Sequence, residues 1–209
     1  MGKGKEYCVG LLLAVIIVVL NLELVMSSTS FYESQFEKNG AYDVFGKETV
    51  DKEREVLVRF IKNGESISST LLNEKEKRHM EDVHELYKRM VFGAYGVVGI
   101  LVVLLLRGKG NKKGVMVKAG VITIAGVIGI LLLSMQFRES FILFHEVMFD
   151  NELWILNPET DNLLKLFPES FFKSFVKTIA GGSLGVGLLL LLSGIKDKKE
   201  QGWWNKRSE

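Results

Sequence analysis

Four long apolar segments constrain this 209-residue sequence more than any other feature. They cover residues 7–26, 90–106, 115–137 and 174–195. The hydrocarbon core of a bilayer is about 30 Å thick, and a helix rising about 1.5 Å per residue crosses it in roughly 17–25 mostly apolar residues. A soluble core would need its apolar residues spread through the whole chain. We therefore predict an all-α integral membrane protein with four transmembrane helices.

The charged residues indicate how these helices are oriented. The chain has 27 Lys and Arg against 25 Asp and Glu, but basic residues gather in the N-terminal flank, the connection 107–114 and the tail 196–209. The two longer connections, 27–89 and 138–173, hold more acidic than basic residues. Because an excess of Lys and Arg in short flanks marks the cytoplasmic side, we expect both termini to be cytoplasmic and both long loops to be extracytoplasmic.

The first apolar segment raises the question of a cleaved signal peptide. It follows basic residues and precedes Ser-Ser-Thr-Ser, as such peptides do. Its apolar stretch is longer than usual and lacks an Ala-x-Ala cleavage site, so we expect a retained anchor. The single cysteine, Cys8, excludes an intrachain disulfide.

Local patterns predict two helices outside the apolar segments. Residues 50–62 show apolar side chains at helical spacing, with Thr49 in the N-cap position and Gly64 after the end. Asn73-Glu-Lys-Glu resembles a capping box, and no Pro follows before the next span. We therefore expect one continuous helix over about 74–106, and a small helical cap formed by the two outer loops.

Two further patterns predict contacts of the second outer loop and the fourth span. The fourth span carries a Gly-x-x-x-Gly at 181–185, a spacing that allows close helix contact in lipid. We expect that contact to lie within one chain rather than between chains. The aromatic residues near the loop are typical of a water–lipid boundary; they are Trp154, Phe167, Phe171, Phe172 and Phe175.

Two familiar kinds of catalytic site find no support in the sequence. None of the serines lies in a Gly-x-Ser-x-Gly elbow, and the one cysteine lies in the first span. His145-Glu146 is only half of a His-Glu-x-x-His zinc motif. His79 and His84 are separated by about 140° around a helix, so they cannot easily share one ion. We predict no metal site and no covalent Ser or Cys mechanism.

Histidine remains as a general acid or base. Neutral imidazole, with an ordinary pKa of about 6.5, can take a proton from an attacking group and return it to a leaving one. His79 and His145 come from two loops on the same predicted side of the membrane, whereas His84 is expected to be a solvated surface residue. On the residues alone, a structural role is favoured for each histidine, and no substrate is defined.

Two longer motifs reverse that balance, because they resemble the bacterial lipoprotein intramolecular transacylase (Lit) family. The resemblance includes the four-span layout and covers essentially the whole chain. The motifs read Glu76-x-x-His79-Met80-x-Asp82-Val83 and Phe144-His145-Glu146, the second continuing through Phe149-Asp150-x-x-Leu153-Trp154-x-Leu156-Asn157-Pro158 and Asp161-x-Leu163-x-x-x-Phe167-Pro168-Glu169-x-Phe171.

The resemblance implies an enzyme of the bacterial cytoplasmic membrane with its active site on the extracytoplasmic face. Such an enzyme moves the sn-2 acyl chain of a diacylglyceryl lipoprotein to the α-amine of its N-terminal Cys. The product is a lyso-form N-acylated lipoprotein. The reaction needs no cofactor and no second lipid, because donor and acceptor belong to one molecule.

The resemblance also implies that His145 and His79 are the catalytic residues. We expect His145 to activate the amine, and His79 to stabilise the oxyanion or return the proton, with Asp82 orienting its ring. Five further residues are candidates for supporting or substrate-binding roles, although each could equally serve loop folding; they are Arg138, Glu146, Asp150, Trp154 and Asp161.

Two alternatives remain open. The first is a non-enzymatic four-span protein that binds a partner through its outer loops. The second is a membrane lipid-ester hydrolase that uses the same histidines and releases free fatty acid. In each case we expect contact with membrane lipid and none with nucleic acid, while the oligomeric state is not defined.

Overall fold

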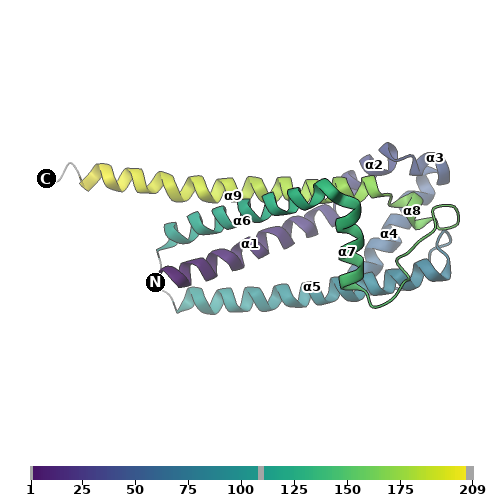
Figure 1. Cartoon of the computed structure of the whole chain (residues 1–209), viewed down its shortest axis with the longest axis horizontal. Helices are drawn as coiled ribbons and strands as arrows, with labels where there is room; N and C mark the ends of the chain where they lie inside the picture. Colours follow the sequence, from purple (N-terminus) through teal and green to yellow (C-terminus); the bar gives the residue numbers. More distant parts are fainter. Residues whose placement is uncertain (1, 108–110, 206–209) are drawn as a thin grey trace. The chain divides into compact units, whose positions relative to one another are not determined.

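The computed structural model describes the backbone of residues 2–107 and 111–205, and the side chains of residues 2–107 and 111–195. In this part of the chain every regular element is helical (Figure 1). Four helices are long and apolar enough to cross a membrane, as predicted. Residues 108–110 of the predicted cytoplasmic connection, and the side chains of the basic tail 196–209, lie outside the described residues.

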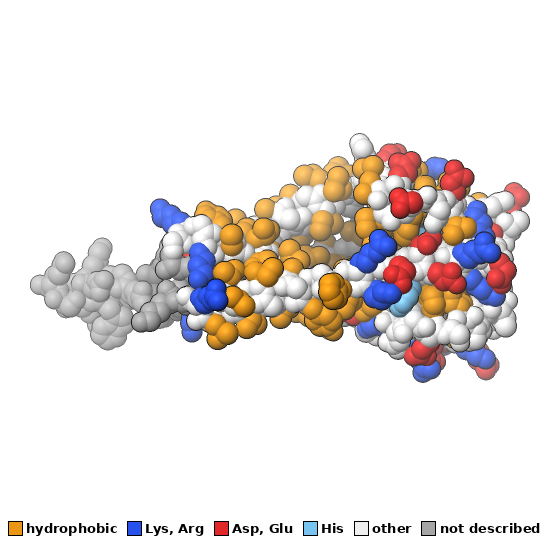
Figure 2. Space-filling view, turned by 90° about the horizontal axis from the view of Figure 1, so that it is seen from below, with side chains coloured by type: hydrophobic (Ala, Val, Ile, Leu, Met, Phe, Trp, Pro, Cys, Tyr) orange, Lys and Arg blue, Asp and Glu red, His pale blue; other side chains and the backbone are white. Residues whose placement is uncertain are grey.

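The chain divides into two compact units, of which the first contains the membrane spans. It consists of the described parts of Met1–Glu23, Gly93–Leu132 and Thr178–Glu209. On the face seen in Figure 2, hydrophobic side chains cover much of the coloured surface of this unit, as contact with lipid acyl chains requires. The helices that contribute are α1 (Lys3–Met26), α5 (Glu74–Leu106), α6 (Lys112–Leu133) and α9 (Glu169–Asn205).

Glycines bring α1, α6 and α9 into close contact, side by side in Figure 1. A Cβ atom added at Gly120 would lie 2.6 Å from the carbonyl oxygen of Gly187, and one at Gly182 would overlap the Asn21 side chain. The predicted contact through the glycines of 181–185 is wrong, because within the described chain nothing lies within 4 Å of a Cβ at either position. The close approaches occur at other glycines of the same helix.

The second unit is a helical cap made of Leu24–Phe92 and Leu133–Lys177. Helix α6 ends at Leu133, and a 3₁₀ turn, η1 (Ser134–Gln136), follows it. Besides the outer parts of α5 and α9, the cap contains α2 (Thr29–Lys38), α3 (Ala41–Phe45), α4 (Lys47–Asn63), α7 (Phe137–Met148) and α8 (Leu163–Leu166). His145 therefore lies on a helix, α7, and not in an irregular loop.

Helix α4 has the predicted amphipathic pattern but begins earlier than predicted. Its buried side chains include Val50 and Leu57, and Gly64, with φ of 72°, follows its last residue as expected. The N-cap is Gly46 and not Thr49. The reason is the backbone of Gly46, whose φ of 79° suits glycine and few other residues, so the chain turns into the helix there.

An aromatic cluster forms the core of the cap. The ring of Phe36 lies 5.7 Å from that of Phe167, and the ring of Tyr32 lies 5.5 Å from that of Phe171. Phe171 is only 3% exposed, and Phe172 and Phe175 pack against the same cluster. Phe171 is thus buried against α2, Phe167, Phe172 and Phe175 are half-buried, and Trp154 packs on His145 instead. That these rings form a belt at the lipid boundary stays a prediction.

The predicted capping box opens α5 and is confirmed. The Asn73 side chain accepts a hydrogen bond from the Glu76 amide (3.0 Å), and the Glu76 carboxylate accepts one from the Asn73 amide (2.7 Å). The other carboxylate oxygen of Glu76 accepts from the amide of Leu163 in α8 (2.5 Å). Glu76 is fully buried. One carboxylate thus joins the start of α5 to the segment between α7 and α9.

We predict that Glu76→Gln loosens this junction, because an amide cannot accept as strongly at both positions as a carboxylate does. Loss of a buried, charge-assisted hydrogen bond costs about 1–3 kcal/mol. Hydrogen exchange should therefore become faster at the Leu163 amide and along α8. Glu74→Gln, at an exposed carboxylate of the same helical turn, is the matched control. Unchanged exchange in α8 of Glu76→Gln would contradict the assigned role.

Candidate active site

The cap brings His79 of α5 and His145 of α7 together. Their ring centroids are 6.0 Å apart, with 36° between the ring planes. The two residues are only 7% and 8% exposed, respectively. Two imidazoles side by side in a buried position cannot both carry charge at low cost. The site therefore favours neutral rings.

Aromatic rings enclose His145. Its ring centroid lies 4.2 Å from that of Phe141, 5.1 Å from that of Trp154 and 5.5 Å from that of Phe149. Burial lowers the pKa of His145, while the bond to the Phe141 backbone opposes that change. The ring is therefore neutral at physiological pH and poorly exposed to water.

One hydrogen bond sets the tautomer of His145. Its Nδ1 lies 2.7 Å from the carbonyl oxygen of Phe141, one turn earlier in α7. A carbonyl oxygen only accepts hydrogen bonds, so Nδ1 carries the hydrogen. In the neutral ring this leaves the lone pair on Nε2. The arrangement is the one that a general base requires.

His79 is the more strongly perturbed of the pair. The pKa of His79 is lowered to about 4, chiefly by burial and in addition by the nearby His145 and Lys75, while Asp82 opposes the change. Its Nδ1 is buried and has no hydrogen-bond partner among the described residues. Buried polar atoms are usually paired. His79 thus offers a neutral ring nitrogen that is available to a ligand.

Asp82 lies one helical turn after His79 and is half-buried. Its carboxylate accepts a hydrogen bond from the side-chain amide of Asn151 (2.9 Å), which holds the segment after α7 against α5. Asp82 acts on His79 through its charge, by raising the pKa of the ring. A direct role in orienting the ring stays a prediction.

The four remaining predicted site residues differ in their burial and in whether they contact a histidine ring. Trp154 is half-buried and packs on His145. Arg138 is exposed on α7, two turns before His145 and on the same side of the helix. Glu146 and Asp150 are exposed near the end of α7. Of these four, the structure brings only Trp154 into ring contact with a histidine.

Asp161 serves the fold of the loop. Its carboxylate accepts hydrogen bonds from the Asn157 amide (2.7 Å) and the Asn73 side chain (2.8 Å). These bonds, the first above all, hold the pKa of Asp161 below its ordinary value although burial opposes them. They tie the turn that begins at Asn157 to the start of α5.

His84 is not the solvated surface residue that we predicted. It is half-buried, its Nδ1 lies 2.9 Å from the carbonyl oxygen of Ile61, and its ring packs on Phe60. The Ile61 carbonyl is one of the last four of α4, which have no partner within the helix. His84 therefore caps α4.

The sequence analysis missed three residues of this site: Phe141, Phe149 and Asn151. Phe141 precedes His145 by four residues, a spacing that signals contact once α7 is recognised as a helix. The contact of Phe149 with His79, at 5.4 Å between ring centroids, joins two distant segments. The sequence carries no local signal for that contact or for the bond between Asn151 and α5.

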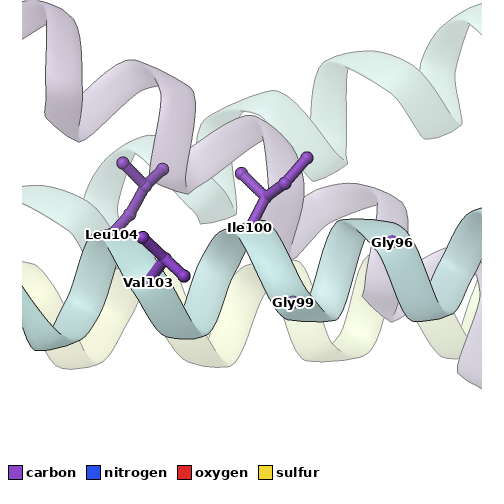
Figure 3. A pocket seen from close by; sticks show the side chains of 5 residues that line it. All are labelled: Gly96, Gly99, Ile100, Val103 and Leu104. Atoms are coloured by element: carbon purple, nitrogen blue, oxygen red, sulfur yellow. The ribbon is translucent and has the colours of Figure 1, made fainter.

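Other features of the described chain supply no chemistry. Among residues 2–107 and 111–195, no group of three or more His, Cys, Asp or Glu side chains could hold a metal ion. A shallow hollow in the membrane unit is lined by α5 alone (Figure 3). Its residues are apolar and none is titratable; they are Gly96, Gly99, Ile100, Val103 and Leu104.

Comparison with known proteins gives a family and a fold. The model of the family described as "Lipoprotein intramolecular transacylase Lit" matches residues 7–172. The solved structure of the membrane integral lipoprotein intramolecular transacylase Lit from Bacillus cereus superposes with a TM-score of 0.80, at 22% identity, over 94% of this chain and 96% of that chain. A variant of that protein with one histidine replaced by alanine gives 0.77, at 21% identity, over 94% of each chain.

A further relative is an uncharacterized protein of Aquifex aeolicus. It is 29% identical over 143 residues, which are 66% of this chain and 62% of that protein. The match therefore spans less than two thirds of the relative's own length.

We predict that His79 makes the stability of the cap depend on pH. Unfolded His79 takes up a proton below about pH 6.5, whereas folded His79 excludes it until about pH 4. The stabilisation is present above pH 6.5 and is lost as the pH falls toward 4, by up to about 3 kcal/mol. Hydrogen exchange of cap peptides should show this loss, and His79→Gln should flatten it. An equal pH dependence in both proteins would contradict the shift.

Proposed function

This chain belongs to the lipoprotein intramolecular transacylase Lit family, and on that premise we propose that it is a membrane transacylase acting on a lipoprotein. The sn-2 acyl chain of a diacylglyceryl lipoprotein moves to the α-amine of its N-terminal Cys. The observation that carries the proposal is the buried pair of neutral imidazoles, His79 and His145, at 6.0 Å. A neutral ring pair is suited to proton transfer without metal or covalent intermediate.

The reaction exchanges one acyl bond for another. The amine nitrogen attacks the ester carbonyl carbon, the new C–N bond forms, and the C–O bond to glycerol breaks. The amine proton finally reaches the glycerol oxygen. An α-amine has a pKa of about 7.7–8.0, so much of it must lose a proton before attack.

His145 is the base that takes the proton from the amine. The bond from Nδ1 to the Phe141 carbonyl leaves Nε2 as the acceptor. Burial lowers the pKa of His145, so the ring is free to accept a proton at physiological pH. The same Nε2 can return the proton to the departing glycerol oxygen.

His79 stabilises the oxyanion of the tetrahedral intermediate. Its pKa of about 4 keeps the ring neutral, so it acts as a hydrogen-bond donor and not as an imidazolium. Its Nδ1 has no hydrogen-bond partner among the described residues, so this nitrogen is available to hydrogen-bond the substrate. A donor held in place in a dry site is worth more than the same donor in water.

The aromatic enclosure favours transfer over hydrolysis. Phe141, Phe149 and Trp154 cover His145 on several sides and leave little access for water. Water is the competing nucleophile in the hydrolase alternative. The amine competes well because it belongs to the same molecule as the ester, which raises its effective concentration.

We also propose that the cap lies on the extracytoplasmic face of the bacterial cytoplasmic membrane. The support is the charge pattern. The N-terminal flank and the connection 107–114 are basic, and the two segments that form the cap are not. Arg138, Glu146 and Asp150, exposed on or near α7, are candidates for contact with the headgroup or peptide of the substrate.

We predict that His145→Gln and His79→Gln each lower formation of N-acylated lyso-lipoprotein by at least about 100-fold, because each removes one proton-transfer or oxyanion group. Mass spectrometry of lipoprotein N-terminal peptides, in a host lacking other N-acylation, measures the product. His84→Gln is the matched control, since a glutamine amide can still donate to the Ile61 carbonyl, and it should retain activity.

Three other outcomes would argue against the proposal. Normal product from either histidine variant would remove the catalytic assignment. Free fatty acid in place of the N-acyl product, from the unaltered protein, would support the hydrolase alternative. The partner-binding alternative would be supported by two results together. The natural protein would give no N-acylated product, and both histidine variants would leave the cellular phenotype unchanged.

We predict that Trp154→Leu slows single-turnover acyl transfer. In a plot of that rate against pH, the loss of rate on the acid side should begin at a higher pH. Removing the indole admits water to His145, and burial is the main reason that the pKa of His145 lies below its usual range. Trp154→Phe should largely restore the rate and the pH profile. Ile155→Ala, at an exposed neighbouring position, is the control. A slower rate with an unmoved pH profile would indicate a merely structural role for Trp154.

A further inference from the structure

Helix α7 has two apolar faces, one that is buried inside the cap and one that is largely exposed, although the Phe144 ring of the second face touches the His145 ring edge-on (5.4 Å between centroids). Phe137, Phe141 and His145 recur every four residues, and this face packs within the cap. Leu143, Phe144 and Val147 lie on a second face, where they are 59%, 49% and 70% exposed. We call these three residues the α7 strip.

The α7 strip is unlike the outer surface of an ordinary soluble helix. Such a helix places polar side chains opposite its buried face. In α7 Glu139 and Glu146 occupy a third side and Arg138 lies on the side of His145, so the α7 strip carries no charged residue. Contiguous exposed apolar side chains mark a surface that contacts something else.

The chain leading into α7 identifies the bilayer as that partner. Helix α6 has 22 residues and is about 33 Å long, enough to cross the hydrocarbon core without α7. Only η1 separates the two helices, and three residues reach about 10 Å at most. Helix α7 therefore starts close to the end of a membrane span.

Apolar side chains are also exposed along this stretch. Leu132, Leu133 and Met135 are exposed large hydrophobic residues, so the chain that leads from α6 to α7 carries exposed apolar side chains before the α7 strip begins. A helix with one apolar face and a charged side is typical of the lipid–water interface.

We infer that α7 is a membrane-docking helix whose strip, Leu143, Phe144 and Val147, inserts into the lipid–water interface. The inference rests on the fold and the exposed side chains and not on the proposed reaction. Docking would hold α7, and His145 with it, at the depth where the ester bonds of lipids lie. The helix would then serve as both a wall of the site and its anchor in the lipid.

Fluorescence quenching by brominated lipid tests this inference in the full-length protein. In a Cys8→Ser background, Leu143→Cys and Val147→Cys carry an environment-sensitive dye in phosphatidylcholine–phosphatidylglycerol nanodiscs. The lipids are brominated near the headgroup end of the acyl chain. Val121→Cys, exposed on α6, is the positive control, and Lys52→Cys, exposed on α4, is the aqueous control.

The expected result is a blue-shifted, quenched dye at positions 143 and 147, as at position 121, and an unquenched dye at position 52. Unquenched dyes at 143 and 147 would overturn the inference. A blue shift without quenching, seen only in discs that contain several copies of the protein, would also overturn it. In that case the α7 strip would contact a second copy of the chain and not lipid. Neither readout depends on catalysis, so failure of the proposed function would not affect it.

Discussion

The buried carboxylate of Glu76 is the interaction on which the arrangement of the cap depends. It accepts hydrogen bonds from the amides of Asn73 and Leu163, and so connects the first turn of α5 to the segment between α7 and α9. Glu76 and His79 are three residues apart on one helix, so they share a face. The bond that fixes where α5 begins therefore also helps to fix where His79 meets the segment that carries His145.

Burial gives the two histidines their chemical character. Desolvation disfavours the charged form of each ring, and the neighbouring His145 further disfavours a charge on His79. The hydrogen bond from His145 to the Phe141 carbonyl selects one tautomer, whereas His79 keeps an unpaired nitrogen. Two identical side chains thus acquire different capacities, one as proton acceptor and one as neutral donor.

The same helix relates the site to lipid. Helix α7 presents His145 and Phe141 to the interior of the cap and an apolar strip to its exterior. A transacylase needs both, because its substrate is a lipid and its nucleophile must compete with water. Glu139 and Glu146 lie away from both faces, whereas Arg138 lies on the side of His145, which explains why the sequence of this helix shows no simple two-sided pattern.

The sequence by itself determined the elements whose signals are local. Apolar length predicted four spans, and the spacing of Asn73 and Glu76 predicted the start of α5, because caps and spans depend on residues a few positions apart. It misjudged His84, whose burial depends on α4, and it carried no signal that Phe171 is buried against α2. Only the tertiary structure decided that His79 and His145 meet, that Asp82 bonds to Asn151, and that Trp154 covers a histidine. These contacts join residues far apart in the chain, and no local periodicity encodes a distance across a folded core.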